Sequence, residues 1–389
     1  MNRMQAWSGM FAVPSLDGLI SPDYCVFGLV CESEVRYFEH LFKTSLLVGQ
    51  FAQKSKGIGS GFNRLYTDDF GTIPTMVPPV SEQTYIVRFL NHVDRRIRRY
   101  IRAKQKLIVL LEEQKRAIIH QAVTGKIDVR TGKPYPAYKD SGVAWLEEVP
   151  EHWKESEKIK YLASLKGRLG WQGLKAGEYT SVGPHIVSSA HFSDHKINWG
   201  ECPRVTQERY ERDQNIQLRR GDILLMKDGA AMGKLAFVDG LPGPACLNSH
   251  LLLFRPLDFD EEPTYFPQFM FYYMQSECFQ GYVQINGTGA TFLGISQESV
   301  GNHKICLPPH SEQVAIVKHL DKCIAEIDIV IGGTNRKIEF LGEYQARLIA
   351  EVVIGKLDVR EAAAELPEDV VPSDHDESEA EYTREHPPM

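Results

Sequence analysis

The sequence contains twice the stretch that decides its fold. The first copy begins Pro78-Pro79-Val80-Ser81-Glu82-Gln83 and ends Gly125-Lys126-Ile127-Asp128-Val129-Arg130. The second begins Pro308-Pro309-His310-Ser311-Glu312-Gln313 and ends Gly355-Lys356-Leu357-Asp358-Val359-Arg360. The offset between the copies is the same at both ends, so they align without a gap. A repeat of this length sets the organisation of the chain before any shorter motif is considered.

Each copy is predicted to form one long helix. Its apolar positions recur at alternating steps of four and three, the spacing of a coiled-coil seam. The helix should start after the prolines and stop at Gly125 or Gly355, and at about 1.5 Å per residue it would be roughly 65 Å long. An isolated helix cannot bury its single apolar stripe, so the two helices are expected to pack on each other. The alternative is that they are two unrelated core helices. Polar Lys104 and Thr334 lie midway along the two stripes. The predicted seam positions are Ile86, Leu90, Val93, Ile97, Tyr100, Lys104, Leu107, Leu111, Gln114 and Ile118 in the first copy, and Ile316, Leu320, Cys323, Ile327, Val330, Thr334, Lys337, Leu341, Tyr344 and Leu348 in the second.

Composition is that of a soluble protein, with 43% hydrophobic and 24% charged residues. No apolar run is long enough for a membrane span, and the seven scattered cysteines indicate a reduced, cytoplasmic protein. Residues 361–389 carry ten acids and one base, so that without them the formal charge rises from −7 to +2. Residues 78–130 carry twelve bases and five acids, and the cluster between Arg95 and Arg102 is either a solvated helix face or an attraction between the two helices.

The repeat divides the chain into six segments. They are residues 1–77, a globular unit; 78–130, the first long helix; 131–150, a linker; 151–307, a larger globular unit; 308–360, the second long helix; and 361–389, a disordered acidic tail. The first globular unit is expected to be an incomplete copy of the second. Its Tyr37-Phe38 matches Tyr265-Phe266, and its residues 9–13 match the neighbourhood of 233–238. A mixed α+β fold follows.

Motifs for catalysis are missing from the sequence. Residues 229–235 resemble a phosphate-binding loop, but only three residues separate the glycines and Leu235 supplies no hydroxyl for magnesium. Neither Pro-Pro pair follows the Asn or Asp that an amino-methyltransferase requires. The histidines show no metal-ligand spacing. We therefore expect neither catalysis nor a bound cofactor or metal.

The two repeated stretches, residues 78–130 and 308–360, together resemble those of the specificity subunit of a Type I restriction-modification system. Residues 145–153, Trp-Leu-Glu-Glu-Val-Pro-Glu-His-Trp, resemble the family's entry into its second target-recognition domain, and residues 221–229 its core strand and loop. The resemblance implies two α/β target-recognition domains, the first one truncated here, separated by two long antiparallel conserved helices that form a coiled coil. It also implies a non-catalytic subunit that reads a bipartite double-stranded DNA target and docks methyltransferase and restriction subunits. S-adenosylmethionine, ATP and Mg would bind those partners, and no membrane is involved.

Base readers are expected in loops, with Arg or Lys for guanine and Asn or Gln for adenine. For each candidate, a surface or turn role is the alternative. Two other functions stay open for the whole chain: a coiled-coil scaffold that does not bind DNA, and an inactive truncated copy of a specificity subunit. The candidates are Arg168, Lys227, Lys234, Asn248, Thr288 and Thr291 in the larger unit and Arg3, Asn63 and Arg64 in the smaller one.

Overall fold

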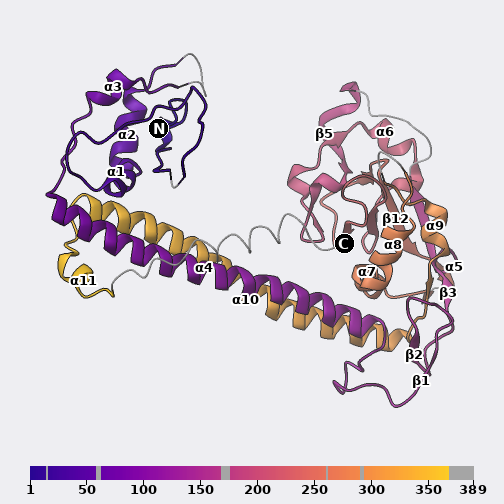
Figure 1. The fold of residues 1–389 in the computed structure, drawn as a ribbon. Helices are drawn as coiled ribbons and strands as arrows, with labels where there is room; N and C mark the ends of the chain where they lie inside the picture. Colours follow the sequence, from indigo (N-terminus) through magenta and orange to yellow (C-terminus); the bar gives the residue numbers. More distant parts are fainter. Residues whose placement is uncertain (15, 58–62, 168–175, 260–261, 290–292, 368–389) are drawn as a thin grey trace. The chain divides into compact units, whose positions relative to one another are not determined.

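The structure, a computed structural model, describes residues 1–14, 16–57, 63–167, 176–259, 262–289 and 293–367 (Figure 1). These residues form two compact units. The first unit contains residues up to 107 and from 332 onward, and the second unit contains residues 108–331. We describe each unit by itself.

Both long helices are present, as α4 (Val80–Val123) and α10 (His310–Val353). Each begins directly after its Pro-Pro pair, and the second proline's carbonyl accepts the first backbone hydrogen bonds of the helix. Each ends just before a glycine in the left-handed region, with φ of +73° at Gly125 and +75° at Gly355. The last residues of each repeated stretch therefore lie beyond the helix.

The first unit is helical. Phe11, Phe51 and Leu65 form its core together with Leu90 of α4 and Val352 of α10. Its other elements are η1 (Ala6–Ser8), α1 (Val35–Phe42), α2 (Ser45–Lys54), α3 (Thr67–Gly71) and α11 (Arg360–Ala364).

The second unit is built on a four-stranded antiparallel sheet in the order β10-β9-β12-β4. Its strands are β4 (Ala163–Gly167), β9 (Ile223–Met226), β10 (Leu235–Phe237) and β12 (Leu251–Pro256). A second sheet has the order β11-β5-β8, from β5 (Tyr179–Val187), β8 (Arg204–Val205) and β11 (Ala245–Leu247). Short pairs are β1 (Tyr138–Asp140) with β2 (Glu148–Pro150), β3 (Glu157–Lys158) with β15 (Lys304–Ile305), β6 (Phe192–Ser193) with β7 (Lys196–Ile197), and β13 (Asp258–Phe259) with β14 (Glu262–Pro263).

Cores on both faces of the main sheet explain its uninterrupted apolar strands. Leu225 faces a core shared with the helices, whereas Leu224 faces a core shared with the second sheet. A strand buried on both faces reads as a continuous apolar run. The helices are α5 (Ile159–Leu162), α6 (Gln207–Glu211), α7 (Pro267–Gln275), α8 (Glu277–Ile285) and α9 (Gln297–Asn302), with 3-10 helices η2 (Ala176–Glu178), η3 (Ser189–His191), η4 (Trp199–Glu201) and η5 (Gln214–Ile216). The predicted mixed fold is confirmed.

A buried glutamine explains the repeated Ser-Glu-Gln. Gln83 accepts the backbone N–H of Glu34 at 2.9 Å, and its amide donates to the first proline of its repeat at 2.8 Å. Gln313 accepts the N–H of Phe266 at 2.8 Å and donates to its own first proline at 2.9 Å. Each glutamine thus ties the start of a long helix to the residue that precedes α1 or α7.

These bonds correct one match made from sequence. Glu34 immediately precedes α1 and Phe266 immediately precedes α7, so the two helices correspond when Glu34 is aligned with Phe266. The match of Tyr37-Phe38 with Tyr265-Phe266 is therefore wrong, and Tyr37 corresponds to Phe269. A shared aromatic pair misled the alignment, because the hydrogen bonds that fix the register involve backbone atoms.

The two long helices pack antiparallel. In the first unit, Leu90 near the start of α4 shares a core with Val352 at the end of α10. In the second unit, Val123 at the end of α4 shares a core with Leu320 near the start of α10. There Lys115 Nζ also lies 2.7 Å from Asp328 Oδ1.

Most of the predicted seam is buried or half-buried. Thr334, a predicted polar seam position, is only 6% exposed, but Tyr100, Val330 and Tyr344 are 49%, 48% and 50% exposed and do not belong to the seam. Gln114 and Lys337 are exposed as well. A straight helix of 3.6 residues per turn drifts away from a strict 3.5-residue stripe, which accounts for these errors. The buried apolar seam residues are Ile86, Leu90, Ile97, Ile316, Leu320, Ile327 and Leu348, while Val93, Lys104, Leu107, Leu111, Ile118, Cys323 and Leu341 are half-buried.

Candidate nucleic-acid interface

Several predicted readers lie at one end of the main sheet. Lys227 directly follows β9, Lys234 directly precedes β10, and Asn248 lies shortly before β12. The register pairs Met226 with Leu251, so these three positions share one end of the sheet. Arg168 and Thr291 lie outside the described residues.

Lys227 joins three loops through its backbone. Its N–H donates to the carbonyl of His250 at 3.1 Å, and its carbonyl accepts the N–H of Ile295 at 2.7 Å. Gly229 N–H donates to Leu293 O at 2.8 Å. The loop after β9, the turn before β12 and the loop after α8 are thereby held as one surface. We name this surface, residues 227–229, 248–250 and 287–295 as far as described, the loop cluster.

The side chains of the loop cluster differ in how far they are already engaged. His250 Nδ1 lies 2.7 Å from Asp228 Oδ1, and both side chains are partly exposed. Thr288 is exposed, and its two backbone groups bond Gly294 at 2.8 and 2.9 Å. The sequence analysis did not single out His250, because nothing in the sequence links it to the loop that carries Asp228.

Lys234 and Asn248 are held by their own surroundings. The Lys234 ammonium donates to Phe192 O at 2.9 Å and to Ser189 O at 3.4 Å. The Asn248 side-chain oxygen accepts the hydroxyl of Ser249 at 3.0 Å. Within the described part of the chain no hydrogen bond or ion pair engages the ammonium of Lys227. Among the described lysine and arginine candidates, Lys227 is therefore the one whose charge is most available to a ligand.

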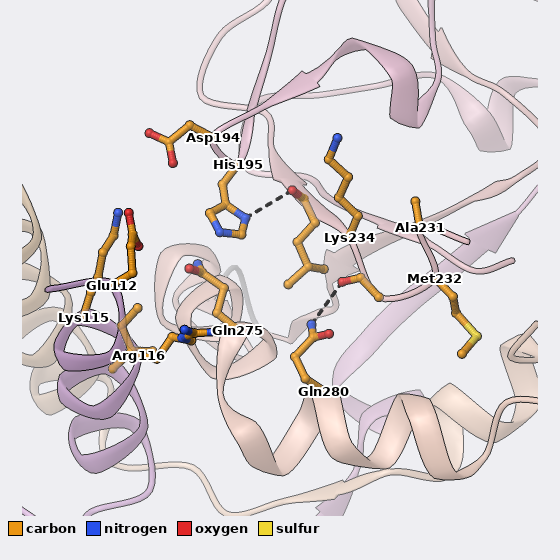
Figure 2. A pocket seen from close by; sticks show the side chains of 13 residues that line it. Glu112, Lys115, Arg116, Asp194, His195, Ala231, Met232, Lys234, Gln275 and Gln280 are labelled. Carbon is orange, nitrogen blue, oxygen red and sulfur yellow. Dashed lines mark hydrogen bonds between the residues drawn. The ribbon is translucent and has the colours of Figure 1, made fainter. Parts of the chain in front are cut away.

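A cavity of about 600 Å³ lies behind the loop that carries Lys234 (Figure 2). Figure 2 shows Lys115 and Glu112 of α4 on one side of it and the segment 231–235 on the other. Gln280 donates to the carbonyl of Gly233 at 3.1 Å, and His195 Nδ1 lies 3.3 Å from Leu235 O. Burial lowers the pKa of His195. Acidic and basic side chains both line the cavity, which makes it a support for the loop rather than a site for one charged ligand.

The first unit contains a counterpart of Lys227. Leu65 N–H donates to Arg3 O at 3.1 Å, just as Ile295 N–H donates to Lys227 O. Leu65 and Ile295 are related by the offset of the repeat, so Arg3 occupies the position of Lys227.

The guanidinium groups of Arg3 and Arg64 are directed at one turn of the first unit. Arg3 Nη2 donates to Pro22 O at 2.6 Å, and Arg64 Nη2 lies 3.3 Å from Asp23 Oδ1. Asn63 is half-buried beside Arg64. The three predicted readers of this unit are therefore brought together, with two of them already engaged.

The described residues contain no cluster of three or more His, Cys, Asp or Glu side chains suited to a metal ion. Nor does any helix within the described ranges combine the length and apolar character needed to cross a membrane. The arginines of the basic run are exposed, and Arg98 pairs with Asp94 at 2.7 Å.

The comparisons with known proteins all find similarity to Type I restriction enzyme specificity subunits. Residues 174–339 match the model of the Type I restriction modification DNA specificity domain. The putative type I restriction enzyme MjaX specificity subunit of Methanocaldococcus jannaschii is 27% identical over 60% of this chain, which covers 54% of that relative's length. The Type I restriction enzyme EcoKI specificity subunit of Escherichia coli is 22% identical over 87% of this chain and 68% of its own length.

A solved structure shows a similar fold. It comes from work on complex assembly and conformational transition of the type I R-M system, and it matches with a TM-score of 0.61 at 18% identity. The match covers 84% of this chain and 72% of that one.

Proposed function

We propose that the chain is a Type I restriction enzyme specificity subunit and that it reads DNA sequence for a Type I restriction-modification complex; the match of residues 174–339 and the two relatives support this proposal. Subunits of this family recognise DNA and are not themselves catalytic. The ligand is double-stranded DNA, and the partners are methyltransferase and restriction subunits in the cytoplasm. S-adenosylmethionine, ATP and Mg then bind to the partner subunits, while this chain recognises the DNA sequence.

The loop cluster is the observation that supports this proposal most directly. Three separate loops present Lys227, Asp228, His250 and Thr288 on one surface at the end of a rigid sheet. A lysine can donate to the O6 and N7 acceptors of guanine, and a threonine can bond either base type. Loops held by backbone hydrogen bonds keep such side chains in place before DNA arrives, which lowers the entropy cost of binding.

A bipartite target follows from the repeat. Arg3 occupies in the first unit the position that Lys227 occupies in the second. Since α4 and α10 each contribute to both units, one pair of helices links the two candidate reading surfaces. We assign one half of the DNA target to each unit.

Replacement of Lys227 tests the reading role. The target is first identified by mapping methylated bases in the source genome with the gene present and deleted. The chain, assembled with its methyltransferase subunits, is then titrated with that duplex at several salt concentrations. Lys227→Ala should weaken binding by about tenfold or more, since one specific base contact contributes about 1–3 kcal/mol.

Two controls give the experiment its resolution. Lys154→Ala removes an exposed lysine outside the loop cluster and should leave affinity nearly unchanged. Lys234→Ala should have a smaller effect than Lys227→Ala, because the chain's own carbonyls already hold the Lys234 ammonium. Equal affinities for the Lys227→Ala and Lys154→Ala complexes would remove Lys227 from the reading surface. Binding that does not depend on salt would argue against DNA recognition altogether.

A further inference from the structure

The glutamate of the repeated Ser-Glu-Gln has different surroundings in the two units. Glu312 is 4% exposed, and its Oε1 accepts the hydroxyl of Tyr135 at 2.6 Å and the indole N–H of Trp153 at 2.9 Å. His152 Nε2 lies 2.8 Å from Glu312 Oε2. Glu82, the repeat counterpart, is half-buried, and no described side chain hydrogen-bonds its carboxylate.

Apolar residues near these two glutamates show the same contrast. Positions that are buried in the second unit are open in the first. Met76 and Val77 are the repeat counterparts of Cys306 and Leu307, and Leu46 corresponds to Cys278 because each is the second residue of its helix, α2 or α8. The exposed fractions are 1% for Cys306 and 91% for Met76, 3% for Leu307 and 47% for Val77, and 8% for Cys278 and 58% for Leu46.

One stretch of chain covers these positions in the second unit. We name it the connector segment, residues 135–158. Its Trp145 carbonyl accepts the thiol of Cys278 at 3.1 Å, and its Lys154 N–H donates to Leu307 O at 3.0 Å. Its end forms β3, which pairs with β15.

The glycines that end the two long helices mark the same difference. A Cβ added to Gly125 would lie 2.3 Å from Pro150 Cδ and 3.1 Å from the ring of Trp153. A Cβ added to Gly355 would meet nothing within 4 Å. The connector segment therefore fills the space beside Gly125, and the space beside Gly355 is open.

That open space is a groove of the first unit. It has a volume of about 560 Å³, and its walls include Leu46, Met76, Val77, Glu82 and Gly355. Each of these residues is the repeat or helix counterpart of a residue that the connector segment contacts or approaches in the second unit.

We propose that this groove is a docking site for an extended segment of another polypeptide with the sequence pattern of the connector segment. The pattern is a tryptophan, then Val-Pro, then His-Trp, after an upstream tyrosine. The tyrosine, histidine and second tryptophan supply donors to the Glu82 carboxylate. The first tryptophan and the proline cover Leu46 and the face beside Gly355. The proposal stands on the comparison of the two units and does not require the chain to read DNA.

A peptide spanning residues 131–158 tests this proposal. It is titrated into the full chain, and hydrogen exchange is followed by mass spectrometry. We expect saturable binding that slows exchange at residues 74–77 and 46–50. A peptide that carries Trp145→Ala and Trp153→Ala should bind at least tenfold more weakly, since it lacks both aromatic anchors.

Variants of the chain locate the peptide. Glu82→Gln should weaken binding by about tenfold because charge-assisted hydrogen bonds are lost. Leu46→Arg should abolish binding, and Glu113→Gln, an exposed change outside the groove, should have no effect. The proposal is overturned if exchange at 74–77 is unchanged at about 1 mM peptide, or if Leu46→Arg binds as tightly as the parent chain. Slowed exchange at 304–307 alone would also overturn it, because the peptide would then have replaced the chain's own connector segment.

Discussion

Replacing Glu312 by glutamine should selectively destabilise the second unit. The carboxylate accepts donors from Tyr135, Trp153 and His152 at 2.6–2.9 Å while only 4% exposed. Hydrogen bonds to a charged group contribute about 1.5–3 kcal/mol each. Glutamine keeps one oxygen for two of these donors but loses the charge and turns an N–H₂ group toward His152. We therefore expect the free energy of unfolding of the second unit to fall by about 2–4 kcal/mol.

The repeat supplies the matched control. Glu82→Gln makes the same change in the first unit, where no described side chain bonds the carboxylate, and should cost less than about 0.5 kcal/mol. Urea unfolding is read by hydrogen exchange at residues 135–158 for the second unit and 34–54 for the first. If Glu312→Gln costs no more than Glu82→Gln, the buried hydrogen bonds do not hold the connector segment and the argument from Glu312 is wrong.

Three further outcomes are expected from the burial of Glu312, Asp222 and Leu320. Burial alone would raise the pKa of Glu312, but the hydrogen bonds that its carboxylate accepts lower this pKa below 4.5. The contribution of Glu312 to stability is therefore present above about pH 4.5 and is lost as the pH falls through the lowered pKa. The free energies of urea unfolding of the parent chain and of Glu312→Gln should accordingly converge at low pH. Asp222→Asn should cost about 3 kcal/mol, measured by urea unfolding, because Asp222 is 1% exposed and both its oxygens bond Arg255 at 2.7 Å; a cost within that of an exposed control would contradict this. Leu320→Ala should lower the melting temperature more than Leu341→Ala, since Leu320 is fully buried and Leu341 is half-buried, and the reverse order would refute the assigned packing.

The ungapped repeat was enough to predict both long helices, their starts and their glycine ends. It was not enough to predict which seam positions are buried, and Tyr100 and Tyr344 are exposed because the helices do not follow a strict 3.5-residue stripe. Helix ends depend on local residues, which sequence displays directly. Seam burial depends on the course of a second helix, which it does not display.

The candidate interface shows a similar division. Lys227 and Thr288 could be chosen from sequence because each lies in a loop with glycines. Their union into one surface could not, because it depends on backbone hydrogen bonds from Lys227 to His250 and Ile295, and any residue type can form these. The equivalence of Arg3 and Lys227 has the same offset as the sequence match between residues 9–13 and the neighbourhood of 233–238, which is shorter than the offset of the long repeat. The shared bond to Leu65 or Ile295 fixes this equivalence in the structure.

The two copies of Ser-Glu-Gln show that a repeated sequence can specify a framework without specifying its cover. Gln83 and Gln313 make the same bonds because both partners belong to the repeat. Glu82 and Glu312 do not, because the donors to Glu312 come from the connector segment. A carboxylate tolerates both situations: it stays hydrated where the groove is open, and it is stabilised where donors reach both of its oxygens. An apolar side chain at this position would favour binding of any apolar segment. A glutamate instead favours a segment that supplies hydrogen-bond donors to its carboxylate, so this residue determines which segments can bind in the groove.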